Sequence, residues 1–499
     1  MYNFKFIDSI KQNIKNTMRY NFLKNSLFIH NFHFSYLLVF IFIISLVSGP
    51  FIPDLIVSFS AIVLLFNYNQ ILQIIRKSRI LQILFLFWFY ILFSSIFSSV
   101  PLKSFFTSFT FLRFLLFVIA VNLLMHEKNL KYVVFYSFLF LYSSLFFDSI
   151  YQIISGHNIL GYPIFNERVS SFFGKELIMG SFISRTFFIV LYLLFSLNLR
   201  NKEIFYFYIV TISLFLVIVS SERTAFFMYS VTLIFSLLFF NKKNILKIIF
   251  FIISLFFIFL FLNKPSLDRL YNHTLSQIVN TNTNKLNLLS YRHQLHFETA
   301  FKIFQQNKIF GAGIKSFRYI CSEKKYSSYD KILLDNKFYA KKSQVGKLFV
   351  NNDKNGKFQN FQIIKDDKIV LKFLYKDGSA FKLYLANNSE VKEGDLIYSY
   401  YEFENGCNTH PHNFYIQFLS EIGIIGFCFL TFFFIFTCYR IIKFILTFLN
   451  NKFLDPKLIL WSGYFAVFFP LIPNGNFFNN YLCLLTFLPL GFYNLCKKY

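Results

Sequence analysis

The chain has 499 residues, of which 56% are hydrophobic and only 15% are charged, yet its formal net charge is +26. A soluble domain is about half apolar and about a quarter charged, so this composition excludes a soluble enzyme, a disordered chain and a disulfide-rich scaffold. Phe occupies 78 positions. AT-rich codon usage favours Phe, Ile, Lys and Asn together, so the Phe excess is not by itself a functional signal.

Twelve apolar segments follow one another along the chain, several of them near the roughly 20 residues that a helix needs to cross a bilayer. They are residues 34–50, 53–68, 80–99, 105–125, 132–150, 178–198, 204–220, 224–240, 245–262, 413–438, 458–473 and 477–495. The sequence therefore predicts an all-α polytopic membrane protein with about 12 transmembrane helices. About nine of them form a bundle over 34–262, and about three form a C-terminal group over 413–499.

The distribution of Lys and Arg predicts the orientation of these segments. Of the 27 Lys and Arg outside the long stretch 263–412, 21 fall on one side of the predicted bundle, together with both termini. Excess Lys and Arg in short loops marks the cytoplasmic side. Residues 1–33, which carry no signal-peptide pattern, are then a cytoplasmic segment, and 263–412 lie outside. The net charge reports topology, and nucleic acid is not expected as a partner.

The stretch 263–412 is the one part that resembles a soluble domain. Apolar residues at helical spacing predict helix over about 264–320. Alternating residues from about 344 to 403, with a hairpin signal at Asp377–Gly378, predict a small β-rich insert.

The strongest local pattern is the string CNTHPHNFYIQFLSEIGIIG, from Cys407 to Gly426. Asn413, Gln417 and Glu421 are four residues apart, so they form a polar stripe on an otherwise apolar helix. Glu421 is either a packing carboxylate or a catalytic group. His412, at the outer boundary, is either a general base or an interfacial cap.

The cysteines of the outer stretch favour a disulfide over a metal site. His410 and His412 with Cys407 lack a second cluster of zinc ligands. A bond between Cys321 and Cys407 is expected instead, because both lie outside the cytoplasm. No P-loop, HExxH or GxSxG pattern is present in the sequence, and no cofactor is expected.

Several arginines fall on the outer side, against the charge bias. Arg168, Arg223 and Arg292 are each either ion-paired or snorkelling residues or ligands of a pyrophosphate group, because the planar guanidinium matches phosphate oxygens. Arg113 and Arg185 lie in or beside spans and are interpreted as ion-paired or snorkelling residues.

The chain resembles the O-antigen ligase and polymerase family of bacterial envelope glycosyltransferases. The likeness rests on the dozen spans, on the large outer loop before a late span, and on the string HPHNFYIQFLSEIGIIG (410–426). The SSERTA string (220–225), Arg292 and the GAGIKSF string (311–317) also match family positions.

This resemblance implies metal-independent transfer of a glycan from an undecaprenyl-pyrophosphate carrier to a hydroxyl of a lipid A-core sugar or another glycan. The reaction would take place at the periplasmic face of the inner membrane, among membrane lipids. Arg223 and Arg292 would bind the pyrophosphate and His412 would act as base. Asn413 and Glu421 would position or polarise the site.

Three alternatives remain open at this point. The donor class is shared by a ligase, a polysaccharide polymerase and a protein O-oligosaccharyltransferase; the late position of the outer loop favours a ligase. A transporter or flippase would show matched broken helices in two halves. A non-enzymatic assembly protein would depend on the β-rich insert and not on His412.

Overall fold

The structure is a computed structural model. It describes residues 32–165, 167–262, 279–280, 285–286, 291–321, 323, 325–326, 332–334, 338–340, 347–352, 359–365, 368–375, 382–385, 397–400, 406–451 and 453–493.

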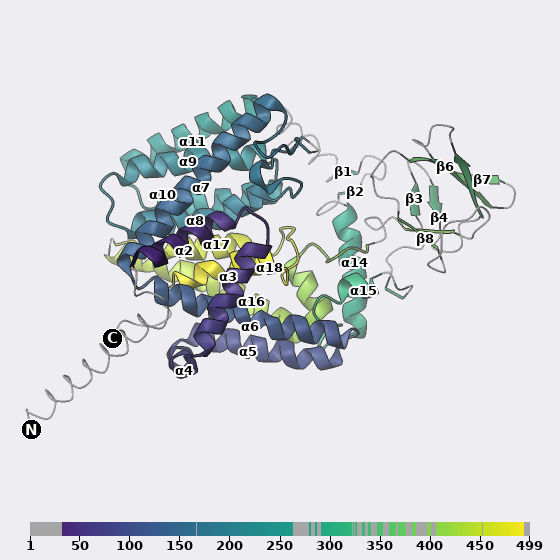
Figure 1. Cartoon of the computed structure of the whole chain (residues 1–499), viewed down its shortest axis with the longest axis horizontal. Helices are drawn as coiled ribbons and strands as arrows, with labels where there is room; N and C mark the ends of the chain where they lie inside the picture. The colour runs from purple at the N-terminus through teal and green to yellow at the C-terminus, as the bar shows by residue number, and fades with distance from the viewer. Residues whose placement is uncertain are drawn as a thin grey trace, which may run out of the picture.

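Helices make up most of the described chain (Figure 1). The helices before residue 263 are α2 (Phe32–Ser45), α3 (Phe51–Leu65), α4 (Tyr68–Lys77), α5 (Arg79–Ser94), η1 (Ser95–Phe97), α6 (Pro101–Leu124), α7 (Lys128–Ser155), η2 (Ser171–Phe173), α8 (Met179–Ser196), α9 (Lys202–Val219), α10 (Arg223–Leu237) and α11 (Lys242–Leu262). The later helices are α14 (Tyr291–Gln306), α15 (Phe317–Ile320), α16 (Phe414–Asn451), α17 (Lys457–Val467) and α18 (Asn480–Gly491).

Each of the twelve predicted apolar segments contains one of these helices, and the chain is a multi-pass membrane protein. Six helices of the described chain are long and apolar enough to cross a membrane. They cover Arg79–Phe97, Pro101–Leu124, Lys128–Ser155, Met179–Ser196, Lys202–Val219 and Phe414–Asn450. The other six apolar helices have 10–17 residues, so twelve full spans remain a prediction.

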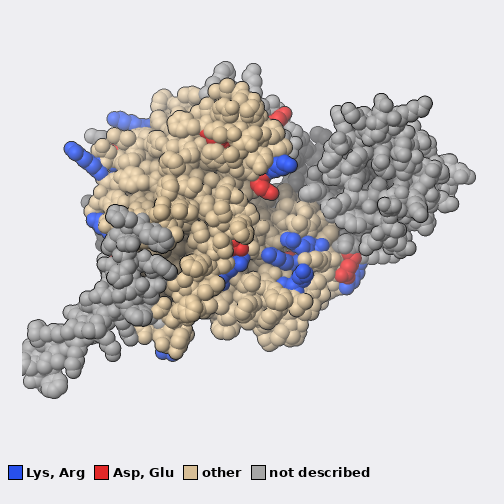
Figure 2. All heavy atoms as spheres, viewed as in Figure 1, with Lys and Arg blue, Asp and Glu red and all other residues tan. Residues whose placement is uncertain are grey.

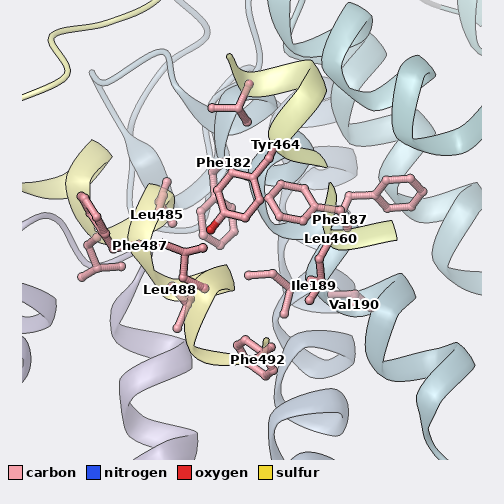
Figure 3. Packing of buried hydrophobic residues seen from close by; sticks show 14 of the residues in the cluster. Phe182, Phe187, Ile189, Val190, Leu460, Tyr464, Leu485, Phe487, Leu488 and Phe492 are labelled. Carbon is pink, nitrogen blue, oxygen red and sulfur yellow. The ribbon is translucent and has the colours of Figure 1, made fainter. Parts of the chain in front are cut away.

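Helix α8 lies at the centre of the bundle, because 83% of its apolar window is buried, against 28% for α5 and for α16. Figure 3 shows Phe182 and Phe187 of α8 packed among side chains of α17 and α18, including Tyr464 and Leu485. Close approach is possible because Gly463 faces the ring of Phe188; a Cβ at that position would lie 2.2 Å from the ring. The core is therefore built around α8.

Large apolar side chains also cover much of the outside of the bundle. Phe51, Phe66 and Phe250 are each at least 75% exposed, although they lie in or directly after apolar helices. Exposed apolar surface on this scale is costly in water. Contact with lipid hydrocarbon explains it.

Strands occur in the outer stretch, where the sequence predicts them after about residue 344. They are β1 (Val279–Asn280), β2 (Lys285–Leu286), β3 (Ile332–Leu334), β4 (Phe338–Ala340), β5 (Lys347–Asn352), β6 (Gln359–Lys365), β7 (Lys368–Tyr375), β8 (Lys382–Leu385) and β9 (Ile397–Tyr400). β6 pairs antiparallel with both β5 and β7, and β8 pairs with β9. The residues between these strands lie outside the described chain, so a β-rich insert that folds as one unit stays a prediction.

Two local predictions for this stretch are wrong. The Asp377–Gly378 signal predicts a hairpin between its flanking strands, but β7 pairs with β6 and β8 with β9. The predicted helix over about 264–320 is also wrong at residues 279–280 and 285–286, because β1 and β2 form a short antiparallel ladder. The sequence between them is rich in Asn and Thr, which favour turns over helix. The described helices of this part are α14 and α15.

Candidate functional site

A cavity of about 1750 Å³ is lined by residues of both halves of the bundle and of α14 and α15. Figure 2 shows basic side chains gathered in a hollow of the molecular surface. The charged lining residues are Arg168, Lys175, Arg185, Arg223, Arg318, Glu176 and Glu222. Apolar side chains such as Leu46, Leu160 and Phe172 complete the walls. The cavity thus combines excess positive charge with an apolar surface.

Its floor is the loop between two short helices, α17 with 11 residues and α18 with 12. At 1.5 Å per residue each is about 16–18 Å long, roughly half the hydrocarbon thickness. Non-helical backbone is tolerated at such depth only where it is buried in protein or lines a wet cavity. Ile472, Asn474 and Asn476 of this loop line the cavity, so the loop satisfies that condition.

The polar stripe of α16 holds this floor in place. The Asn413 side chain donates to Pro470 O at 2.7 Å and accepts from Tyr415 N at 2.9 Å, so it also caps the start of the helix. Gln417 Nε2 donates to Asn476 Oδ1 at 2.8 Å, and its Oε1 accepts from Phe477 N at 2.9 Å. Asn413 therefore affects the cavity indirectly, through the loop backbone that it positions.

Glu421 lies at the far end of the stripe and is not among the residues that line the cavity. It is fully buried. One carboxylate oxygen accepts from Gln417 Nε2 at 2.9 Å and the other from Phe317 N at 3.3 Å. In this structure Glu421 anchors the 313–317 segment, in agreement with its interpretation as a packing carboxylate.

Helix α16 is broken next to Glu421. Gly423 has φ 70° and ψ −169° inside the helix, a conformation that glycine adopts readily. The break frees the carbonyls of Ser420 and Glu421, which accept from Ala312 N at 2.9 Å and from Gly313 N at 2.7 Å. The GAGIKS segment is thus bound to α16 through backbone hydrogen bonds.

His412 lines the cavity at the start of α16. Its φ of 58° lies in the left-handed region, and its carbonyl accepts from Asn474 N at 2.8 Å. Asn408 Oδ1 accepts from Thr409 N at 2.7 Å, which leaves Asn408 Nδ2 to donate to His412 Nε2 at 2.8 Å. This contact assigns the lone pair to Nε2 and the proton to Nδ1.

Three further histidine rings surround His412. The ring centroids of His410, His296 and His293 lie 4.2, 5.2 and 5.4 Å from that of His412. Burial, followed by the charges of these neighbours, lowers the pKa of His412 to about 2. Burial likewise lowers the pKa values of His293 and His410 to about 4. In the described chain no group of three or more His, Cys, Asp or Glu is arranged to hold a metal.

His293 and His296 could have been noticed from the sequence, because they are three residues apart on a predicted helix beside Arg292. That spacing does not reveal that they meet His412 from the other end of the outer stretch. Their place in the cluster comes from the packing of α14 against α16.

The predicted arginines reach the cavity in different ways. Arg223 is the first residue of α10 and lines the cavity. Arg168 also lines it, where its guanidinium contacts Glu222 Oε1 at 3.2 Å and donates to Ser220 O and Leu177 O. Arg292 is the second residue of α14, directly before cavity-lining His293; its side chain lies outside the described part.

Glu222 lies between these cations. Its Oε1 also accepts from Gly180 N at 3.0 Å, at the start of α8. Burial raises its pKa to about 7, although the charge of Arg168 works in the opposite direction. The carboxyl therefore exchanges its proton near neutral pH, next to the arginines.

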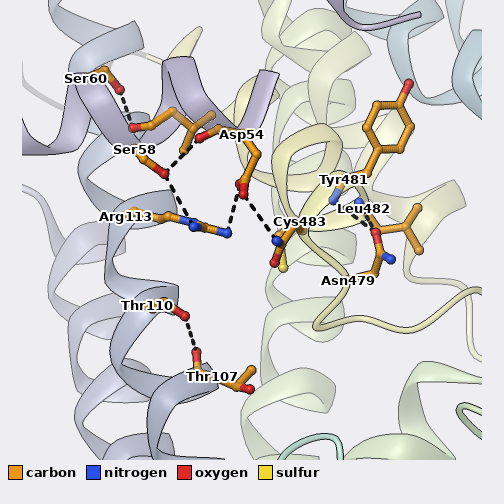
Figure 4. A network of polar contacts seen from close by, with 12 residues as sticks. Asp54, Ser58, Ser60, Thr107, Thr110, Arg113, Asn479, Tyr481, Leu482 and Cys483 are labelled. Carbon is orange, nitrogen blue, oxygen red and sulfur yellow. Dashed lines mark hydrogen bonds and ion pairs between the residues drawn. The ribbon is translucent and has the colours of Figure 1, made fainter. Parts of the chain in front are cut away.

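Arg185 is a cavity residue whose role the sequence did not reveal. It is 2% exposed, so it does not snorkel, and its hydrogen bonds go to the neutral side chains of Ser181 and Asn474. The interpretation as an ion-paired or snorkelling residue is wrong for Arg185. Arg113 does form an ion pair. Its guanidinium contacts Asp54 at 2.8 Å, and Figure 4 shows the Arg113 side chain next to both Asp54 and Ser58.

Cys321 and Cys407 are joined by a disulfide with a Cα–Cα distance of 5.1 Å. Both half-cystines are buried in a small core with Ile303 and Phe317. The bond ties the end of α15 to the segment that precedes His412. It fixes the base of the outer stretch beside the cavity.

The profile of the O-antigen ligase family matches residues 207–340. This confirms the family resemblance over a stretch that includes Arg223, Arg292 and the GAGIKS segment but ends before His412. No curated protein and no solved structure matches the chain.

Proposed function

Starting from this likeness to the O-antigen ligase family, we propose that the protein transfers a glycan from an undecaprenyl-pyrophosphate carrier to an acceptor hydroxyl. The lipid A-core sugar is the proposed acceptor, and the periplasmic face of the inner membrane is the proposed location. One observation carries the proposal: Arg168, Arg223 and His412, far apart in the sequence, line one cavity that is cationic and partly apolar.

The cavity suits both parts of such a donor. Its apolar walls and its place in the bundle suit a polyprenyl chain, and its excess of arginine over glutamate suits a pyrophosphate. Arg223 and Arg292 are proposed to bind the pyrophosphate, with Arg168 beside them. These cations stabilise the charge that develops on the leaving group without a metal ion.

The proposed reaction is a single displacement. The acceptor oxygen forms a bond to the anomeric carbon while the bond from that carbon to the pyrophosphate breaks, and the pyrophosphate leaves with the electron pair. His412 Nε2 takes the hydroxyl proton once the acceptor replaces the Asn408 amide at that nitrogen. Asn413 and Glu421 position the cavity through the backbone they hold, at the floor and at the 313–317 segment.

The test uses purified full-length protein in proteoliposomes with lipid-linked glycan and acceptor, and measures product formation. His412→Ala is expected to slow transfer by about a hundredfold or more, and Arg223→Lys by about tenfold because the planar fork is lost. His157→Ala, at an exposed histidine that does not line the cavity, is the matched control. Wild-type turnover by His412→Ala would remove the base assignment. Absence of transfer with retained glycan translocation would favour the transporter alternative.

A further inference from the structure

Two buried hydrogen-bond donors, one on α8 and one on the floor loop, have no partner. Arg185 Nη1 and Asn476 Nδ2 are each buried without a hydrogen bond, in side chains that are 2% and 6% exposed. Both residues line the cavity. A buried donor left unsatisfied is destabilising, so the pair indicates a ligand that supplies acceptor atoms.

The remaining polar atoms of these side chains fix the donors in place. Arg185 Nη2 donates to Asn474 Oδ1 at 3.0 Å. Asn476 Oδ1 accepts from Gln417 Nε2 at 2.8 Å and from Phe478 N at 2.9 Å. The free N–H groups are therefore held by contacts on the opposite side of each group, which lowers the entropic cost of binding.

The charge at this point selects an anion. Arg185 carries a full positive charge that its neutral partners, Ser181 and Asn474, do not offset. The nearby carboxylate of Glu222 acts on Arg185 only through its charge and makes its ion-pair contact with Arg168. The N-terminus of α18, which adds partial positive charge, also lines the cavity through Asn479 and Tyr481. An oxygen with negative charge satisfies both the free donors and the free charge.

The floor is separate in the fold from the position of Arg223. Arg185 lies six residues into α8, about 9 Å along its axis from Met179, whereas Arg223 begins α10. Both positions line the same cavity.

We propose that Arg185 and Asn476 form a floor subsite that binds oxygen atoms of the donor's pyrophosphate and so selects a diphosphate over a monophosphate. This inference rests on the proposed function. It assigns to the floor the oxygens of one phosphate and leaves those of the other to Arg223. The subsite favours the intact donor over carriers that bear a single phosphate.

The test measures binding of farnesyl pyrophosphate and farnesyl monophosphate to the detergent-solubilised full-length protein by calorimetry. Wild-type protein is expected to prefer the diphosphate. Arg185→Gln and Asn476→Asp should each weaken diphosphate binding by about tenfold or more and lose most of that preference. Asn476→Asp keeps Oδ1 and replaces only the free donor with a repelling oxygen, so it tests the subsite even if Arg185→Gln fails to fold.

The controls separate this inference from the proposed function. Arg440→Gln removes an arginine that contacts Tyr493 and Trp461 away from the cavity, and it should bind like wild type. Normal diphosphate binding by Asn476→Asp, together with weakened binding by Arg223→Lys, would overturn the floor subsite and leave the proposed function standing. If wild-type protein binds neither probe, the proposed function itself is wrong.

Discussion

At the residue scale, the hydrogen bond from Asn408 determines how His412 can act. A general base needs a free lone pair and a neutral ring. The amide of Asn408 fixes the lone pair on Nε2, and burial among three other histidines lowers the pKa of His412 to about 2. The ring is neutral over the whole physiological range. Protonation of His412 in the free protein cannot then limit activity near neutral pH.

Asn408→Asp tests this arrangement. The substitution keeps an oxygen for Thr409 N and places a carboxylate at His412 Nε2, which favours the protonated ring and raises the His412 pKa. Activity requires the neutral ring. As the pH is lowered, the activity of Asn408→Asp should therefore begin to fall at a higher pH than the activity of wild-type protein. The check is kcat/KM for glycan transfer from pH 5 to 9, since this ratio reports groups of the free enzyme. A kcat/KM profile of Asn408→Asp that stays as flat toward pH 5 as that of wild type would show that His412 does not accept the proton.

The sequence predicts those site residues whose charge is unexpected at their place in the predicted topology. Arg168 and Arg223 stand out against the charge bias, and the structure brings both to the cavity of His412. Arg185 stands out in the same way, but its unpaired nitrogen depends on which side chains pack around α8. Glu421 shares a helical face with Asn413 by spacing, yet the break at Gly423 and the backbone of Phe317 decide what it contacts.

At the element scale, the break in α16 depends on one glycine. Gly423→Ala should destabilise the protein strongly, because the residue has φ 70° and a Cβ would lie 2.1 Å from the Ile309 backbone oxygen. Gly426→Ala is the matched control: the atoms nearest to its Cβ would belong to the side chain of Ile422 and not to backbone. Melting temperature and detergent-solubilised yield of both variants give the measurement. Equal stability of the two variants would show that the break is not required for the fold.

Hydropathy located all the apolar helices but not their lengths. Segments 458–473 and 477–495 are predicted as spans, whereas the helices end at Val467 and begin at Asn480. The residues between them include Phe468, Phe469, Leu471, Phe477 and Phe478, which are as apolar as any helix. The apolar composition of this loop at membrane depth therefore makes most of it resemble part of a span. The turn residues Pro473, Asn474 and Gly475 mark only the middle of this loop, and the hydrogen bonds to α16 show how the structure holds it.

At the scale of the whole molecule, the charge asymmetry and the position of the cavity together predict a membrane topology. The basic residues that the positive-inside rule assigns to the cytoplasm include Lys128 and Arg200, next to the ends of α7 and α8. Lys175 lies on the cavity rim, between α7 and α8. The Cys321–Cys407 disulfide favours a cavity that faces the periplasm. Lys128 and Arg200 then lie on the opposite side of the membrane from Lys175.

Cysteine labelling of intact spheroplasts tests this topology. Single cysteines at Lys128, Arg200 and Lys175, all exposed positions, are introduced into protein whose Cys428, Cys438, Cys483 and Cys496 are serine. The disulfide remains, since its sulfurs do not react with a maleimide. A membrane-impermeant maleimide should label only Lys175→Cys before permeabilisation and all three afterwards. Labelling of Lys128→Cys in intact spheroplasts would invert the bundle, place the cavity in the cytoplasm and exclude a periplasmic acceptor.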